Sequence, residues 1–155
     1  MNARWRRLAL RTINFWPPFF GAGIRVVKTD RDMRSIDVEM KLRFWNRNYV
    51  GTHFGGSLYS MTDPFFMLML IENLGPNYIV WDKAASIRFM KPGSGKVRAE
   101  FRITDNEIAA IKREADTQGR TEPTFVVKVK DATGDTVAEV EKVLSVRLKP
   151  SEIVV

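Results

Sequence analysis

Residues 51–71 constrain the fold more than any other stretch, because a glycine pair there opens a long apolar segment that carries one carboxylate. The apolar side chains fall on two stripes at helical spacing, so a helix over this segment is apolar on all sides. The unbroken apolar run, residues 64–71, is far shorter than the roughly 20 residues that a bilayer requires. The sequence therefore predicts a long helix at the centre of a globular core.

The carboxylate within this helix belongs to Asp63, about one turn from Tyr59 and one from Met67. We expect it in apolar surroundings, where an unpaired charge costs roughly several kcal/mol. Two interpretations stay open: a functional carboxylate in a cleft, or a structural one bonded to the backbone or to Tyr59. Pro64 has no amide hydrogen for the Ser60 carbonyl, so we also expect a kink beside Asp63.

Composition limits the classes of protein to which the chain can belong. Its 155 residues suffice for one domain, which we assign to residues 1–155, burying about 70% of the unfolded surface. The net charge of +7 favours anionic partners such as nucleic acid, membrane lipid or a phosphorylated small molecule. With no cysteine, the chain can form neither a disulfide nor a cysteine nucleophile, which agrees with a cytoplasmic location. A single histidine gives no reason to expect a metal site.

An N-terminal segment, residues 1–23, carries a basic amphipathic pattern followed by an aromatic connection. One face of the predicted helix is apolar, with Trp5, Leu8, Ala9, Thr12, Ile13 and Trp16, and the other bears Arg4, Arg7, Arg11 and Asn14. The charged start is similar to that of a signal peptide, but no small-residue cleavage site follows, so we read it as mature sequence. We expect the apolar face to pack on the protein body. Membrane-surface binding is the alternative.

The remaining segments read as strands separated by turns. Strands are predicted over residues 24–29, 36–42, 78–90, 97–103, 125–130 and 137–148, the second from the alternation of Ile36, Val38 and Met40 with polar residues. A capping box of Thr104 with Glu107 predicts the start of a short helix between the fourth and fifth strands, and Gly134 marks the turn between the last two. We expect the third and fourth strands to form a hairpin, and likewise the last two. The predicted class is α+β: one antiparallel sheet wrapped around one long central helix, with an extra N-terminal helix.

Two motifs resemble the hotdog-fold acyl-CoA thioesterases, specifically the phenylacetate-type (PaaI-like) group and the uncharacterised thioesterase-like DUF4442 group. The first is the spacing of Asn48, Gly51, Gly55, Gly56 and Asp63. The second is a strand over residues 87–92, ending in a basic residue and proline, that is followed by a glycine. The chain departs from the group's pattern before the glycine pair, where phenylalanine stands in place of histidine and the only histidine comes one residue earlier.

The resemblance implies a hotdog fold and hydrolysis of an acyl-CoA thioester by a homodimer or homotetramer, with no cofactor. The alternative is a hotdog protein that binds acyl-CoA or fatty-acyl groups without turnover. The positive charge alone supports nucleic-acid binding, and no binding motif accompanies it, so we expect neither nucleic acid nor membrane as a partner.

The candidate site residues divide into a catalytic set and a substrate-binding set. Gly56 can stabilise an oxyanion through its free N–H at a helix start, and Asp63 can act as general base or as nucleophile. The catalytic candidates are Asp63, Gly56, Asn48 and His53, the last two with loop-forming roles as alternatives. The substrate-binding candidates are Gly55, Ser57, Tyr59, Phe66, Met67, Arg88 and Lys91, the last two for coenzyme A phosphates unless they are solvated surface charges.

Overall fold

The computed structural model describes residues 12–150. The helical elements are η1 (Ile13–Phe15), α2 (Pro17–Ala22), α3 (Gly55–Ser60), α4 (Phe65–Leu74) and α5 (Asp105–Gln118). The strands are β1 (Ile24–Thr29), β2 (Ser35–Lys41), β3 (Tyr78–Phe89), β4 (Lys96–Arg102), β5 (Arg120–Thr121), β6 (Thr124–Asp131) and β7 (Thr136–Leu148).

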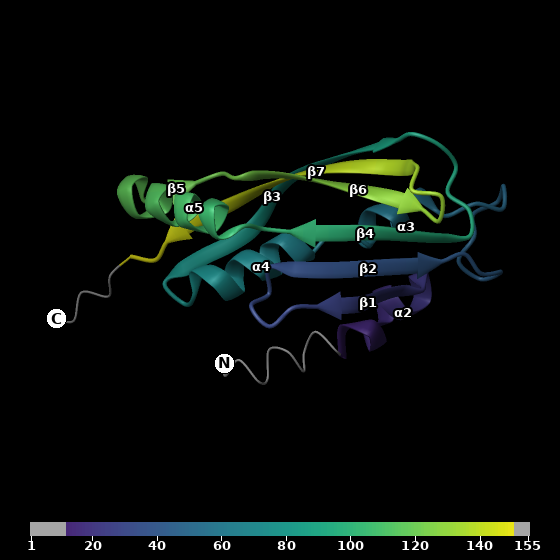
Figure 1. Cartoon of the computed structure of the whole chain (residues 1–155), viewed down its shortest axis with the longest axis horizontal. Helices are drawn as coiled ribbons and strands as arrows, with labels where there is room; N and C mark the ends of the chain where they lie inside the picture. Colours follow the sequence, from purple (N-terminus) through teal and green to yellow (C-terminus); the bar gives the residue numbers. More distant parts are fainter. Residues whose placement is uncertain (1–11, 151–155) are drawn as a thin grey trace.

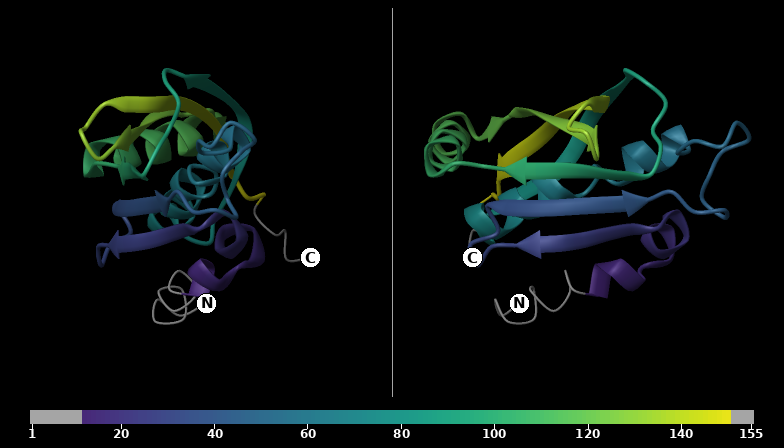
Figure 2. Two further views of the ribbon diagram at one scale, coloured as in Figure 1. Left: turned by 90° about the vertical axis from the view of Figure 1, so that its right-hand side faces the viewer. Right: turned by 45° about the vertical axis from the view of Figure 1, so that its right-hand side comes forward.

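One antiparallel sheet holds all these strands in the order β1-β2-β4-β6-β7-β3, with β5 paired to β7. The sheet curves around α3 and α4, while α5 lies at one end of the molecule (Figures 1 and 2). Alternation drives this arrangement: Ile36, Val38 and Met40 on β2 are buried, as predicted. The predicted antiparallel sheet around a central helical segment is confirmed.

The predicted hairpin between the third and fourth strands is wrong. β3 pairs with β7, and β4 lies between β2 and β6. The connection crosses the sheet, because Met90 still bonds to the carbonyl of Val137 on β7 whereas Gly95 accepts from Leu42, just after β2. The hairpin of β6 and β7 fits into the sheet between these two points. Its turn contains Gly134 at a φ of 91°, as the sequence indicated.

The central helical segment is present over residues 55–74 but is divided at residues 61–64, as Pro64 foreshadowed. α3 closes with tighter bonds: the Thr62 amide donates to the Tyr59 carbonyl at 2.8 Å. α4 then restarts, with Leu68 donating to the Pro64 carbonyl. The division leaves Asp63 in an irregular turn between the two helices, where its side-chain direction is not set by the helix periodicity.

The N-terminal segment also departs from the prediction. Residues 17–23, expected to be an irregular connection, form the helix α2, because proline is tolerated in the first helical turn and Gly23 ends the helix at a φ of 75°. Phe19 is buried against Phe65, whereas Phe20 is exposed. Of the predicted amphipathic helix, residues 1–11 lie outside the described residues, and Ile13–Phe15 form a 3-10 turn.

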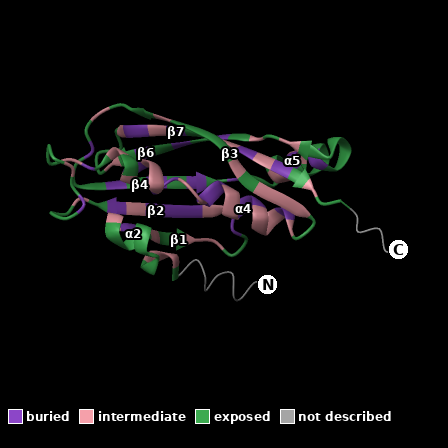
Figure 3. Cartoon of the chain, turned by 180° about the vertical axis from the view of Figure 1, so that it is seen from behind, coloured by how far each residue is buried: buried purple, intermediate pink, exposed green. Residues whose placement is uncertain are grey.

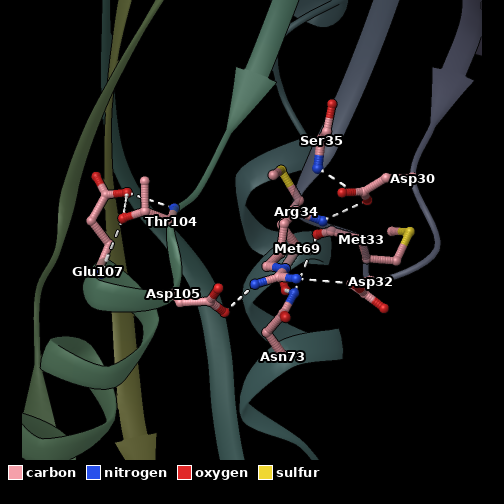
Figure 4. Close-up of polar contacts among 10 residues, drawn as sticks. All are labelled: Asp30, Asp32, Met33, Arg34, Ser35, Met69, Asn73, Thr104, Asp105 and Glu107. Carbon is pink, nitrogen blue, oxygen red and sulfur yellow. Dashed lines mark hydrogen bonds and ion pairs between the residues drawn. The ribbon is translucent and has the colours of Figure 1, made fainter.

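The turn between β1 and β2 is bonded to the end of α4 and to the start of α5 (Figure 4). Met33 is buried there at a φ of 55°, and its carbonyl accepts from Asn73 at the end of α4. Arg34 forms ion pairs with Asp32 and with Asp105 in the first turn of α5. The predicted capping box, Thr104 with Glu107, opens α5. This network fixes where α4 ends.

One face of α4 is less well covered than the other. Seen from behind, α4 shows a mixture of buried and intermediate residues beside the mostly exposed β3 (Figure 3). Met67, Leu68 and Ile71 are half-buried, whereas Phe65, Met69 and Leu70 are buried in the core. None of the helices within residues 12–150 is long and apolar enough to span a bilayer.

Candidate active site

A buried ammonium group organises the surroundings of Asp63. Lys142 on β7 has a fully buried side chain, and its Nζ donates to Asp63 Oδ1 at 2.9 Å. Asp82 Oδ1 on β3 lies 3.2 Å from the same nitrogen, and the Tyr59 hydroxyl on α3 lies at 3.5 Å. Two of the three ammonium hydrogens are therefore bonded, to Asp63 and Tyr59, and Asp82 faces the same nitrogen as an ion pair. We call Tyr59, Asp63, Asp82 and Lys142 the lysine cluster.

The sheet directs Lys142 and Asp82 inward. Lys142 occupies a core position of β7, in a row with Val140 and Leu144. Asp82 pairs with Leu144 and Ala85 with Lys142, so these two β3 residues, three apart, share the inner face. Strict alternation would place them on opposite faces, and a bulge at Lys83 absorbs the extra residue. The bulge therefore turns the Asp82 carboxylate toward Lys142.

Charge and burial act against each other within the lysine cluster. Burial tends to lower the pKa of Lys142, but the carboxylates of Asp63 and Asp82 outweigh it and raise that pKa above its ordinary value. Burial raises the pKa of Asp82, which Lys142 offsets only in part. Burial likewise raises the pKa of Tyr59. With both carboxylates ionised, the cluster carries two negative charges and one positive charge.

The expectation of apolar surroundings for Asp63 is wrong. Its side chain is 49% exposed, and it has a charged partner beneath it. The break between α3 and α4 explains the difference, because the turn brings the carboxylate to the surface instead of into a helix stripe. One Asp63 oxygen is therefore anchored by Lys142 while the side chain remains accessible to a reactant.

The glycine pair opens α3, as predicted. Phe54 is the N-cap residue and has no side-chain acceptor, and no hydrogen bond among residues 12–150 uses the N–H of Gly55 or Gly56. A Cβ on Gly55 would lie 3.0 Å from the Phe89 ring, and one on Gly56 would lie 2.5 Å from the Phe54 ring. A side chain at either position would push against one of these two exposed rings. The two free N–H groups are donors available to an incoming carbonyl oxygen.

His53 makes no hydrogen bond to the lysine cluster. His53 is buried, its ring Nε2 is 3.1 Å from the Gly95 carbonyl, and its backbone N–H donates to Gly93. Since a carbonyl only accepts, Nε2 carries the hydrogen. Nδ1 is buried and has no hydrogen-bond partner among the described residues. This geometry matches the loop-forming role for His53.

Asn48 also uses its side chain within the loop. Its oxygen accepts from the amides of Val50 and Thr52, and its nitrogen donates to the Thr52 hydroxyl at 2.9 Å and to the His53 carbonyl at 3.3 Å. All of the polar atoms of the Asn48 side chain are thus committed to the turn before α3. The loop-forming role suits Asn48 as well, and it fixes the approach to the glycine pair.

The substrate-binding candidates are scattered. Phe66 is core, because its ring stacks on Phe125 at 4.5 Å between centroids and meets Phe101 edge-on at 5.1 Å. Arg88 is paired with Glu139, and Lys91 with Asp131 and Asp135. Those carboxylates raise the pKa of Lys91, so it stays charged. Gly55, Ser57, Tyr59 and Met67 are half-buried on the central helical segment. Of the substrate-binding candidates, only Tyr59 belongs to the lysine cluster with Asp63.

Sequence reasoning missed two members of the lysine cluster. Lys142 had a detectable signal, since it interrupts the inward row of an alternating strand with a charge. Asp82 had none, because its direction depends on the bulge at Lys83. Within residues 12–150, no group of three or more His, Cys, Asp or Glu side chains is placed to hold a metal ion.

Comparison with protein families gave one match. The model described as "Domain of unknown function (DUF4442)" covers residues 6–146. No curated protein matched at a significant level.

Several solved structures share the architecture. A protein of unknown function from Pseudomonas aeruginosa, PA5026, described as a probable thioesterase, aligns with a TM-score of 0.81 at 19% identity, covering 96% of this chain and 97% of its own. The Escherichia coli PaaI protein aligns with a TM-score of 0.61 at 19% identity, covering 94% and 98%. The Streptococcus mutans protein smu.793, bound to acetyl CoA, aligns with a TM-score of 0.58 at 20% identity, covering 83% and 91%. The predicted hotdog fold is confirmed.

A substitution separates the two roles of His53. Burial lowers the pKa of His53, so the folded protein takes up this proton less readily than the unfolded chain. Stability should therefore fall as the pH drops below about 6.5, the ordinary value. We expect His53→Gln, which keeps a donor for the Gly95 carbonyl, to reduce this acid-side loss in thermal melts across pH.

Turnover of any thioester substrate by His53→Gln should stay within about threefold of wild type, against the 10²-fold loss typical of removing a general acid or base. Such a loss with an unchanged pH dependence of stability would place His53 in the chemistry instead.

Proposed function

We propose that this chain, which belongs to the DUF4442 family, hydrolyses an acyl-CoA thioester to the free acid and coenzyme A. The observation that carries the proposal is the Asp63 carboxylate, accessible at its surface and held from below by the buried Lys142 ammonium. It lies seven residues after Gly56, the spacing that the thioesterase groups share with this sequence. Residues 1–155 then form one hotdog domain, which we place in the cytoplasm.

The chemistry requires a base or nucleophile and a site for negative charge. Asp63 would take a proton from water or attack the thioester carbonyl directly. The oxyanion would receive hydrogen bonds from the free N–H groups of Gly55 and Gly56, a contribution typically worth about 10²–10³ in rate per donor. Glycine at both positions lets the carbonyl approach the backbone, with the exposed rings of Phe54 and Phe89 beside it.

Coenzyme A is the partner that best explains the charge. The chain carries a net +7, and the coenzyme is an anion. A structural neighbour was solved with acetyl CoA bound, which makes an acyl-CoA a reasonable ligand here. Arg88 and Lys91 remain candidates for binding the coenzyme A phosphates. The phosphates would have to displace Glu139 from Arg88, and Asp131 and Asp135 from Lys91.

One observation favours the second candidate, binding of acyl-CoA or fatty-acyl groups without turnover. Phe54 stands where the thioesterase groups carry histidine, and His53 is committed to the loop. If catalysis in the group requires that histidine, this chain retains the binding surface alone. Measurement of hydrolysis separates the two candidates.

We also propose a homo-oligomer of at least two subunits. β3 is a long edge strand, paired with β7 on one side and with no described strand on the other, and it exposes Trp81 and Phe89. Unpaired edges of this length are covered in most proteins. Near it, Met67 and Leu68 on α4 are only half-buried. A second copy would cover both features and place the site at the subunit boundary.

Light scattering at micromolar concentration tests the oligomer. We expect a mass of at least twice the 17.8 kDa of one chain. Trp81→Lys, which adds charge to the exposed edge, should weaken association. A monodisperse species at the mass of one chain would contradict the proposal.

Asp63→Asn tests the catalytic role. The substitution keeps volume and hydrogen-bonding capacity but removes basicity, so thiol release should fall by at least about 10²-fold with acyl-CoA binding retained. Asp32→Asn, on the exposed β1–β2 turn, is the matched control and should leave the rate unchanged.

The thermal midpoint of Asp63→Asn should fall whichever role Asp63 has, because Lys142 loses an ionised partner. Stability therefore does not discriminate between the roles, and turnover does. Wild-type thiol release in Asp63→Asn would remove Asp63 from the mechanism and leave the binding function as the better account.

A further inference from the structure

Lys142 is the one lysine or arginine buried among residues 12–150. A buried ammonium is retained only where the surrounding groups neutralise it, and a methionine or leucine would fit the apolar row of Val140 and Leu144 without that requirement. Its presence therefore costs stability unless its partners balance it. The partners available are those of the lysine cluster, and two of the three are carboxylates.

The two carboxylates differ in a way that matters for the site. Asp63 is half exposed, in the turn between α3 and α4, whereas Asp82 Oδ1 is buried. Asp82 makes no hydrogen bond through that oxygen, and it faces the ammonium at 3.2 Å as an ion pair only. Lys142 thus holds a well-bonded carboxylate on its exposed side and a competing one on its buried side.

From this geometry we infer that Lys142 is a positioning residue, which anchors the Asp63 carboxylate at the helix break. The positive charge of Lys142 is shared between Asp63 and Asp82. The inference rests on the proposed function, since it assigns Lys142 and Asp82 to the support of a catalytic Asp63. Asp82 then sets how much of the Lys142 charge is left for Asp63. Tyr59 completes the set of titratable groups that face Lys142 from α3, the helix break and β3.

Opposite effects of two substitutions test the inference. Lys142→Met keeps the length of the side chain but leaves two carboxylates facing each other. The acid limb of the kcat/KM profile should move to higher pH by about 1 unit or more, as expected for the loss of a cation within hydrogen-bond distance. Asp82→Asn removes the competing charge and leaves Lys142 to Asp63 alone. Its acid limb should move to lower pH.

The matched control is Lys83→Met, on β3 next to Asp82. Lys83 is the extra residue of the bulge, pairs with Glu122 and is half exposed, so its charge lies outside the lysine cluster. We expect its acid limb to coincide with that of wild type. A merely structural role for Lys142 would lower the thermal midpoint of Lys142→Met without moving the acid limb in either variant.

A second readout needs no activity. Burial already raises the pKa of Asp82, and Lys142 opposes the rise, so removal of Lys142 should raise it further. Carboxyl-carbon NMR titration, with the Asp82 signal assigned by its absence from Asp82→Asn, should show a midpoint about 1 pH unit higher in Lys142→Met than in wild type or Lys83→Met. If Lys142→Met does not fold, the downward shift of the acid limb in Asp82→Asn decides the question.

The outcomes separate this inference from the proposed function. No thiol release by wild type would sink hydrolysis, and the Asp82 titration would still show whether Lys142 and Asp82 are coupled. Hydrolysis with an acid limb unmoved in both Lys142→Met and Asp82→Asn, and an unmoved Asp82 midpoint, would overturn the inference and leave the proposed function intact.

Discussion

An ammonium group inside an apolar sheet is stable only where carboxylates neutralise it, and this requirement fixes the relative positions of β7, β3 and the turn between α3 and α4. Lys142 enters from β7 in a row of valines and leucine. Asp82 meets it because β3 bulges, and Asp63 meets it because Pro64 interrupts the helix. The bulge in β3 and the break between α3 and α4 thus each bring one carboxylate to the same buried charge.

The same arrangement explains how a carboxylate can be both accessible and ordered. A surface aspartate without a partner would sample several rotamers, and a fully buried one would not reach a substrate. Asp63 avoids both conditions, since one oxygen is tied to Lys142 and nearly half of the side chain is exposed. The glycine pair at the start of α3 supplies free N–H donors within the same helical segment. The hydrolysis that we propose uses both features.

Much of the fold follows from local signals in the sequence. Alternation identified the buried residues of β2, the capping box of Thr104 and Glu107 marked the start of α5, and Pro64 marked the interruption of the central helical segment. The hairpin of β6 and β7 also followed, but the partner of β3 did not, because pairing over long separations leaves no local pattern; the expected partner was β4, and the actual one is β7. At the site, the spacing of the glycine pair and Asp63 was readable. The cation beneath Asp63 could not be predicted, because Lys142 lies on a strand 79 residues later in the chain.

Thiol release from a panel of acyl-CoA thioesters of different chain length and head group, measured with the wild-type protein, tests the account most directly. Because the Asp63 carboxylate is anchored by Lys142 and lies accessible in the same helical segment as free backbone donors, we expect hydrolysis of at least one member well above the uncatalysed rate. Binding of acyl-CoA without any thiol release across the panel would contradict the account and identify a hotdog protein that binds acyl-CoA without turnover.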